Sequence, residues 1–178
     1  VGIDEAGRGC LFGPVCVAAV ILNDITLNPP PYEIKDSKKC SPKKRKILKE
    51  YIEENSIAYH VQLIHHDDID TLNILQATMK GMHLCIDEIL KEITIDRILV
   101  DGTYFPYYTD KDLNVIDHVC IQGGDNKYLN IAAASILAKE YHDEYIINLV
   151  KENPILENYD ILNNKGYGTK SHIEAIKE

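Results

Sequence analysis

Four acidic residues in this chain lie at the ends of short apolar runs, and this repeated pattern constrains the fold. The runs are short and rich in β-branched side chains, and turn-forming residues border them, which favours strands over buried helices. Because helical patterns separate these strands, we expect a largely central sheet with helices on its faces. Strand ends in such sheets hold functional side chains. The acids are Asp4, Glu5, Asp101 and Asp125.

The remaining patterns complete an α/β chain. Ser41 followed by Pro42 is typical of a helix start, because the hydroxyl caps the first turn and proline suits the first helical position. Thr169 is expected to cap the last helix, and 104–114 is expected to be a loop. The predicted strands cover 1–4, 15–22, 56–64, 97–101 and 116–122, and further helices are predicted from Pro42 and over 68–92 and 128–152.

Length and composition favour one α/β domain of 178 residues, 45% of them apolar. No apolar stretch approaches the roughly 20 residues of a membrane span. The five cysteines are scattered and form no C-x-x-C pair, which disfavours a zinc site or a disulfide framework. We therefore expect free thiols in a reducing compartment, and hence a cytoplasmic location. We also expect a monomer. The chain starts without Met inside an apparent strand and stops in a helical pattern, so we expect it to be trimmed at both ends.

The net charge of −9 argues mildly against nucleic-acid binding, for which a basic face is usual. Two observations weaken that argument. Divalent metal ions would offset part of a clustered acidic site, and the basic residues are concentrated in KDSKKCSPKKRKILK at 35–49. That stretch is compatible with a solvated helix face, but we expect phosphate contacts from Lys38 and nearby residues.

The four acids predict a metal site if they converge. Adjacent carboxylates repel each other, so Asp4 and Glu5 at the end of a buried strand are costly unless a cation lies between them. Oxygen donors without His or Cys indicate Mg²⁺ or Mn²⁺, and hence phosphoryl chemistry in which two ions assist. The alternative for Asp101 or Asp125 is an ordinary turn position beside glycine.

Two glycine-flanked residues are candidates for substrate contact. Gly7-Arg8-Gly9 could bring backbone donors and acceptors close to a ribose, where they would distinguish a 2′-hydroxyl, or it could be a simple turn. Tyr167, between two glycines, could stack on a sugar or base, or could cover the edge of the core. The pair His65-His66, followed by two aspartates, is expected to be a solvated helix start rather than a metal site.

Together these motifs resemble the type 2 ribonuclease H family (ribonuclease HII). The resemblance runs in family order along nearly the whole chain, and the combination is specific. Its motifs are IDEAGRG with GPV, DSKKCSPKKR, LNILQATMKGM, ILVDG, GGDNKYLNIAAASILAK and KGYGTKSH.

The resemblance implies a ribonuclease H-like fold, with a mixed central sheet flanked by helices. It implies endonucleolytic hydrolysis of the RNA strand of RNA–DNA hybrids and incision 5′ to single ribonucleotides in duplex DNA, leaving 5′-phosphate and 3′-hydroxyl ends. The metal-binding carboxylates would be Asp4, Glu5, Asp101 and Asp125, with Mg²⁺ or Mn²⁺. Gly7, Arg8 and Gly9 would form the junction-sensing turn. Tyr167 would stack on the deoxyribose next to the ribonucleotide.

Some positions depart from the family pattern. Cys10 and Phe12 replace the usual proline and small residue, the Gly124-Asp125 pair follows glycine where lysine is usual (GGD instead of KGD), and His142 stands where arginine is usual. Family members also continue into a further C-terminal segment that contributes to substrate binding. Two alternative functions are a DNA-acting recombinase of the same fold, disfavoured by the two glycine motifs, and a non-catalytic binding module. Four carboxylates disfavour the latter, because they repel phosphate.

Overall fold

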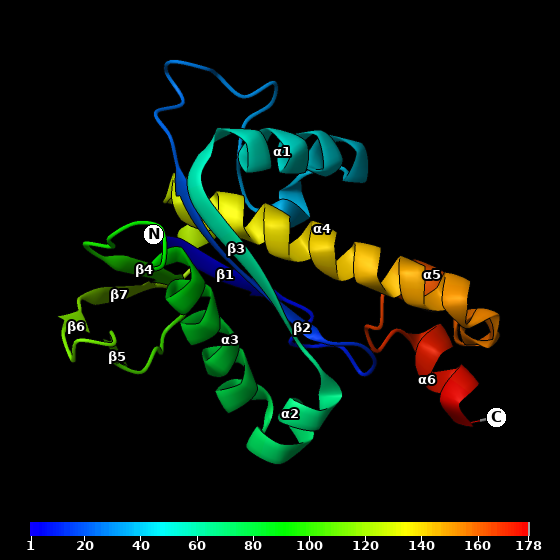
Figure 1. Cartoon of the computed structure of the whole chain (residues 1–178). Helices are drawn as coiled ribbons and strands as arrows, with labels where there is room; N and C mark the ends of the chain where they lie inside the picture. The colour runs from blue at the N-terminus through cyan, green and yellow to red at the C-terminus, as the bar shows by residue number, and fades with distance from the viewer. Residues whose placement is uncertain (178) are drawn as a thin grey trace.

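A five-stranded mixed sheet forms the centre of the molecule in the computed structural model, which describes residues 1–177 (Figure 1). The strand order is β3-β2-β1-β4-β7. Strand β2 pairs antiparallel with β1 and β3, whereas β4 runs parallel to both β1 and β7. The strands are β1 (Gly2–Ala6), β2 (Val15–Leu22), β3 (Ser56–Ile64), β4 (Ile98–Asp101) and β7 (His118–Ile121).

Helices cover both faces of this sheet (Figure 1). One face packs on α3, and the opposite face packs on α1 and the long helix α4. None of the helices within residues 1–177 combines the length and hydropathy that a membrane span requires. The helices are α1 (Pro42–Asn55), α2 (His66–Leu72), α3 (Ile74–Ile89), α4 (Leu129–Glu152), α5 (Ile161–Asn164) and α6 (Lys170–Lys177), with 3₁₀ turns η1 (Ser37–Lys39), η2 (Gly124–Asn126) and η3 (Pro154–Tyr159).

Strand β2 is apolar on both sides because both of its faces are covered. Val17 and Ala19 belong to the core beneath α3, whereas Ala18 and Val20 belong to the core beneath α1 and α4. All four side chains are fully buried. This explains why its sequence is a continuous apolar run instead of an alternating one.

Helix α4 lies unusually close to β1 because small residues face each other. A Cβ atom on Gly2 would lie 2.3 Å from the backbone carbon of Asn130, so glycine is required there. The buried alanines at 132–134 continue the same close contact along the helix. The long helix is thereby held against the strand that carries Asp4.

Both predicted helix caps are confirmed. The Ser41 hydroxyl accepts a hydrogen bond from the Lys44 N–H at 3.4 Å, and Pro42 is the first residue of α1. The Thr169 hydroxyl accepts from the His172 N–H at 3.3 Å at the start of α6. The exposed pair His65-His66 lies at the start of α2, as predicted.

The prediction of one helix over 68–92 is wrong, because two helices meet at Asn73. This residue adopts φ = 73° and ends α2. Its side-chain oxygen then accepts hydrogen bonds from the Leu75 and Gln76 N–H groups, at 3.0 and 3.1 Å, and so caps α3. Asparagine tolerates this left-handed backbone and is a strong N-cap, so it separates two helices whose apolar spacing looks continuous.

The segment predicted as a loop at 104–114 contains part of a small hairpin. Strand β5 (Tyr108–Thr109) pairs antiparallel with β6 (Val115–Ile116). The strand expected over 116–122 is correspondingly shorter, since β7 begins only at His118. Strands of two residues have too little alternation to be read from sequence.

We expect Gly2→Ala to destabilise the fold by about 1–3 kcal/mol, because the new methyl group would force α4 away from β1. Equilibrium denaturation by urea, followed by circular dichroism, measures the change. Gly9→Ala is the matched control, because the nearest atom to its methyl group, in the Tyr167 ring, would be 3.8 Å away. Equal midpoints for the two variants would contradict the close contact.

Candidate active site

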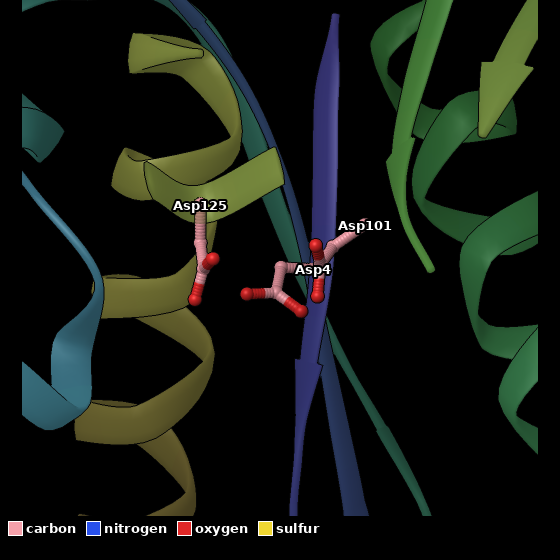
Figure 2. A group of neighbouring side chains, drawn as sticks. All are labelled: Asp4, Asp101 and Asp125. Carbon is pink, nitrogen blue, oxygen red and sulfur yellow. The ribbon is translucent and has the colours of Figure 1, made fainter. Parts of the chain in front are cut away.

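Three aspartates from distant parts of the chain meet at one end of the sheet (Figure 2). Asp4 lies in β1, Asp101 ends β4, and Asp125 lies in η2, just before α4. One carboxylate oxygen from each lies within 4.8 Å of the others. Asp4 and Asp125 are buried, and Asp101 is partly exposed. The sequence prediction that these three acids converge is thus confirmed by the geometry.

The pairing of β1 with β4 explains this convergence. The two strands are parallel, with Ile3 opposite Val100, so the next residue of each strand lies at the same end of the sheet. Ile3 and Val100 both face the core under α3. Because side chains alternate along a strand, Asp4 and Asp101 both face α4.

Asp125 joins the pair through the turn that precedes α4. The Gly124 N–H donates a hydrogen bond of 2.6 Å to Asp101 Oδ1, which fixes η2 against the end of β4. A Cβ atom on Gly124 would lie 2.7 Å from the Ile131 side chain, so the glycine permits this close approach. Gly124 therefore holds η2 close to both β4 and α4, which places Asp125 beside Asp101.

The cluster is electrostatically unfavourable without a cation. Burial raises the pKa of Asp4 well above its usual value, and the neighbouring charges of Glu5 and Asp101 raise it further. Burial also raises the pKa of Asp125, with Asp36 and Asp101 contributing. Three converging carboxylates without His or Cys form a donor set that suits Mg²⁺ or Mn²⁺, and the ion would restore their charged forms.

Glu5 lies beside the three aspartates but outside their group. Its carboxylate is 3.6 Å from the Arg8 guanidinium, and its side chain is largely buried. Burial raises the pKa of Glu5, Arg8 opposes that shift, and Asp101 adds to it. The charge of Asp101 thus acts on the Glu5 carboxyl. The role of Glu5 as a fourth metal ligand stays a prediction.

The two glycine motifs, 160 residues apart, are joined side by side. The Gly7 N–H donates to the Tyr167 hydroxyl at 3.3 Å, and Cys10 forms a β-bridge with Tyr167. The Leu11 N–H donates to the Gly166 carbonyl at 2.8 Å. Gly7 and Gly166 have φ values of +86° and +88°, a backbone conformation that favours glycine. The predicted turn and the predicted stacking tyrosine therefore form a single platform.

This platform, together with Asp4 and Glu5, lines a cavity of about 430 Å³. It also contains polar residues that the sequence analysis did not single out. Ser135 and Lys139 are four residues apart on α4, so they share the helix face that meets the site. The lining residues are Asp4, Glu5, Ala6, Gly7, Arg8, Gly9, Ser37, Lys38, Ser135, Lys139 and Tyr167.

Lys38 reaches this cavity because its segment is fastened to α4. The Ser37 N–H donates to the Ser135 hydroxyl at 3.3 Å, and the two hydroxyls are 2.9 Å apart. The Arg45 guanidinium bonds Glu140 at 2.6 Å and also donates to the Ser37 carbonyl at 3.3 Å. Arg45 is buried, so this member of the basic stretch is structural, whereas Lys38 is exposed.

Comparison with known proteins identifies the family. The model of the family described as Ribonuclease HII matches residues 1–178. The chain is also 45% identical, over 176 residues, to the Ribonuclease HII of Parabacteroides distasonis, covering 99% of this chain and 82% of the relative. The chain belongs to the ribonuclease HII family. It is similarly 44% identical to the Ribonuclease HII of Cytophaga hutchinsonii, over 99% of this chain and 81% of the relative.

Solved structures agree on the ribonuclease H-like fold. A Pyrococcus horikoshii ribonuclease H2 matches with a TM-score of 0.73 and 25% identity, over 97% of this chain and 82% of the other. The ribonuclease HII of Archaeoglobus fulgidus, solved as a complex with PCNA, matches with a TM-score of 0.70 and 26% identity, over 99% and 85%. As a ribonuclease HII, the protein is a metal-dependent endonuclease that degrades the RNA of RNA–DNA hybrids. This confirms the predicted hydrolase over the two alternatives.

We expect Asp4→Asn to stabilise the metal-free protein at pH 7 by on the order of 1 kcal/mol, because it removes a carboxyl group whose ionisation is opposed by burial and by its acidic neighbours. The pKa of Asp4 is higher in the folded protein than in the unfolded chain. The wild-type protein therefore loses stability as pH rises from the unfolded-state pKa to the folded-state pKa. The advantage of the variant should therefore grow as pH rises above about 4. Thermal unfolding in EDTA between pH 4 and 8 measures it, with the exposed Asp112→Asn as control. An advantage that does not change with pH would contradict the strained cluster.

Proposed function

We propose that this ribonuclease HII also incises duplex DNA on the 5′ side of a single embedded ribonucleotide, by hydrolysis that two divalent metal ions assist. The products would be 5′-phosphate and 3′-hydroxyl ends. One observation carries the proposal. The three converging aspartates lie beside a platform in which Gly7 is hydrogen-bonded to Tyr167. Such a site joins hydrolytic chemistry to a surface that could recognise a ribose next to a deoxyribose.

The acidic residues would hold Mg²⁺ or Mn²⁺ and position the scissile phosphate. The three aspartates supply oxygen donors, and Glu5 is the adjacent candidate. When bound, two such ions activate the attacking water and stabilise charge on the leaving oxygen. Lys38 and Lys139 also line the cavity and would offset the negative charge of the nucleic-acid backbone there.

The Gly-Arg-Gly turn has the shape needed to approach a ribose closely. Arg8 and Gly9 are exposed, whereas Gly7 is buried beneath them. With no side chains on Gly7 and Gly9, backbone donors and acceptors could reach a 2′-hydroxyl, the group that distinguishes RNA from DNA. The turn would thereby place the ribose while the acids act on its 5′ phosphate.

Tyr167 would recognise the nucleotide that follows the ribose. Its ring is half-buried, and its hydroxyl is held by Gly7, so the ring has a defined position relative to the turn. An aromatic face stacks on sugars and bases without reading their sequence. A deoxyribose fits closely against such a ring, which supports a preference for an RNA-to-DNA step.

The first test uses a labelled DNA duplex with one ribonucleotide, beside an all-DNA duplex and a continuous RNA–DNA hybrid. With Mg²⁺ or Mn²⁺, we expect a single cut 5′ to the ribonucleotide and no cut in the all-DNA control. Asp4→Asn and Asp101→Asn should lower the rate at least about a hundredfold while the circular dichroism spectrum stays unchanged. Cleavage of the hybrid without cleavage at the single ribonucleotide would overturn the proposal.

The second test asks whether Tyr167 reads the junction. We expect Tyr167→Ala to lower kcat/KM at a single ribonucleotide about tenfold more than it lowers kcat/KM on a long hybrid, because a lost stacking contact is worth about 1–3 kcal/mol. Tyr167→Phe keeps the ring and removes the hydroxyl that Gly7 binds, so it distinguishes the contribution of the ring from that of the hydroxyl. Tyr107→Ala, at an exposed tyrosine outside the cavity, is the control. Equal losses on both substrates would remove the junction-reading role.

A further inference from the structure

A chain of polar contacts runs behind the Gly-Arg-Gly turn and ends at the Tyr167 ring. The His142 imidazole is fully buried, with Nε2 3.7 Å from Cys10 Sγ and Nδ1 3.3 Å from Asp143 Oδ1. Asp143 in turn binds the Lys139 ammonium at 2.7 Å. The Lys139 nitrogen lies 5.5 Å from the centre of the Tyr167 ring. We call Cys10, Lys139, His142 and Asp143 the His142 network.

The network has a consistent arrangement of protons. The Asp143 carboxylate can only accept, which places the imidazole proton on Nδ1. Nε2 then faces the Cys10 sulfur, whose thiol also has the Lys165 carbonyl as an acceptor at 3.6 Å. Although burial alone would raise the pKa of Asp143, its hydrogen bonds to His142 and Lys139 lower it, so the carboxylate stays charged. Each ring nitrogen of this buried histidine thus has one partner, and the ring orientation is fixed.

His142 also determines where the turn can lie. A Cβ atom on Gly7 would lie 2.6 Å from His142 Cδ2, so the imidazole edge occupies the space beside the Gly7 backbone. Gly7 is the residue whose N–H holds the Tyr167 hydroxyl. On the other side, Cys10 forms the β-bridge with Tyr167. The imidazole therefore contacts both backbone segments that hold the tyrosine in place.

The Tyr167 ring is held from three directions. Gly7 binds its hydroxyl, Lys139 lies over its face, and the His142 ring packs beside it with centroids 6.2 Å apart at 56°. Lys139 is itself held by Asp143. A small displacement of the imidazole would therefore move the turn and the ring relative to each other.

We propose that His142 is a positioning residue that fixes the Gly-Arg-Gly turn and the Tyr167 ring in the arrangement needed at a single embedded ribonucleotide. This inference rests on the proposed junction-reading role of Tyr167. Cleavage of a long hybrid, which presents ribose at every position of the strand, depends less on the exact placement of that ring. Replacing His142 should therefore lower kcat/KM more for a duplex with one ribonucleotide than for a long hybrid.

The experiment compares His142→Leu and His142→Gln with the wild-type enzyme. The quantity measured is kcat/KM for a duplex with one ribonucleotide divided by kcat/KM for a long hybrid. Leucine has a similar volume but no polar atoms, and we expect it to lower the ratio about tenfold, as a small misplacement of substrate-positioning groups does. Glutamine restores a polar group near the position of Nε2 and should recover most of the ratio.

Two further variants separate positioning from loss of stability. Val150→Ala removes buried side-chain volume from the same helix, away from Tyr167, and should lower the melting temperature without changing the ratio. Tyr167→Ala reports on the proposed function itself. If Tyr167→Ala lowers the ratio and His142→Leu leaves it within about twofold of wild type, the positioning role is overturned and the proposed function stands. If Tyr167→Ala leaves the ratio unchanged, the junction-reading role fails, and this inference fails with it.

Discussion

The repulsion among three converging carboxylates is the constraint on which the rest of this structure depends. Nothing in the cluster itself favours bringing Asp4, Asp101 and Asp125 together, and burial makes their charged forms costlier still. The energy that holds them comes from elsewhere. The parallel pairing of β1 with β4 places the first two on one face, and packing of α4 on the same face places the third. The fold therefore builds the proposed metal site in advance, and a metal ion would bind to carboxylates that are already together.

Helix α4 connects almost every part of this arrangement. Its first turn follows the loop that carries Asp125, its alanines allow the close approach to β1, and Ser135 fastens the segment of Lys38. One turn further on, Lys139 reaches the cavity, and His142 then contacts the Gly-Arg-Gly turn. A single helix thus aligns the acidic cluster with the platform formed by the Gly-Arg-Gly turn and Tyr167. Small residues where α4 meets β1 and polar residues where it meets the cavity are therefore both found on this one long helix (Figure 1).

The sequence predicted the features that depend on local chemistry. The strand runs and the caps at Ser41 and Thr169 follow from neighbouring residues, as does Asp101 at the end of β4. The strand predicted over 1–4 instead continues to Ala6, so Asp4 lies inside β1, and Asp125 lies in η2. The break at Asn73 was missed because the apolar spacing on both sides favours one continuous helix. Contacts between segments far apart in the sequence could not be predicted either. Arg45 lies in a run of basic residues, and only the fold shows that its partner is Glu140, 95 residues away.

The pairing of Arg45 with Glu140 also bears on how a chain of net charge −9 would bind nucleic acid. Several cations that suggest a phosphate-binding face are already paired across α1 and α4. Arg45 binds Glu140, and Lys49 binds Glu144. Lys139 binds Asp143, and Arg8 lies 3.6 Å from the Glu5 carboxylate, so two of the cations that line the cavity already have carboxylate partners. In the proposed mechanism, attraction for the nucleic-acid backbone near the aspartates would then come largely from the metal ions that they hold. Binding of the metal and binding of the substrate would therefore be coupled, because without the ions the same carboxylates would repel the phosphate.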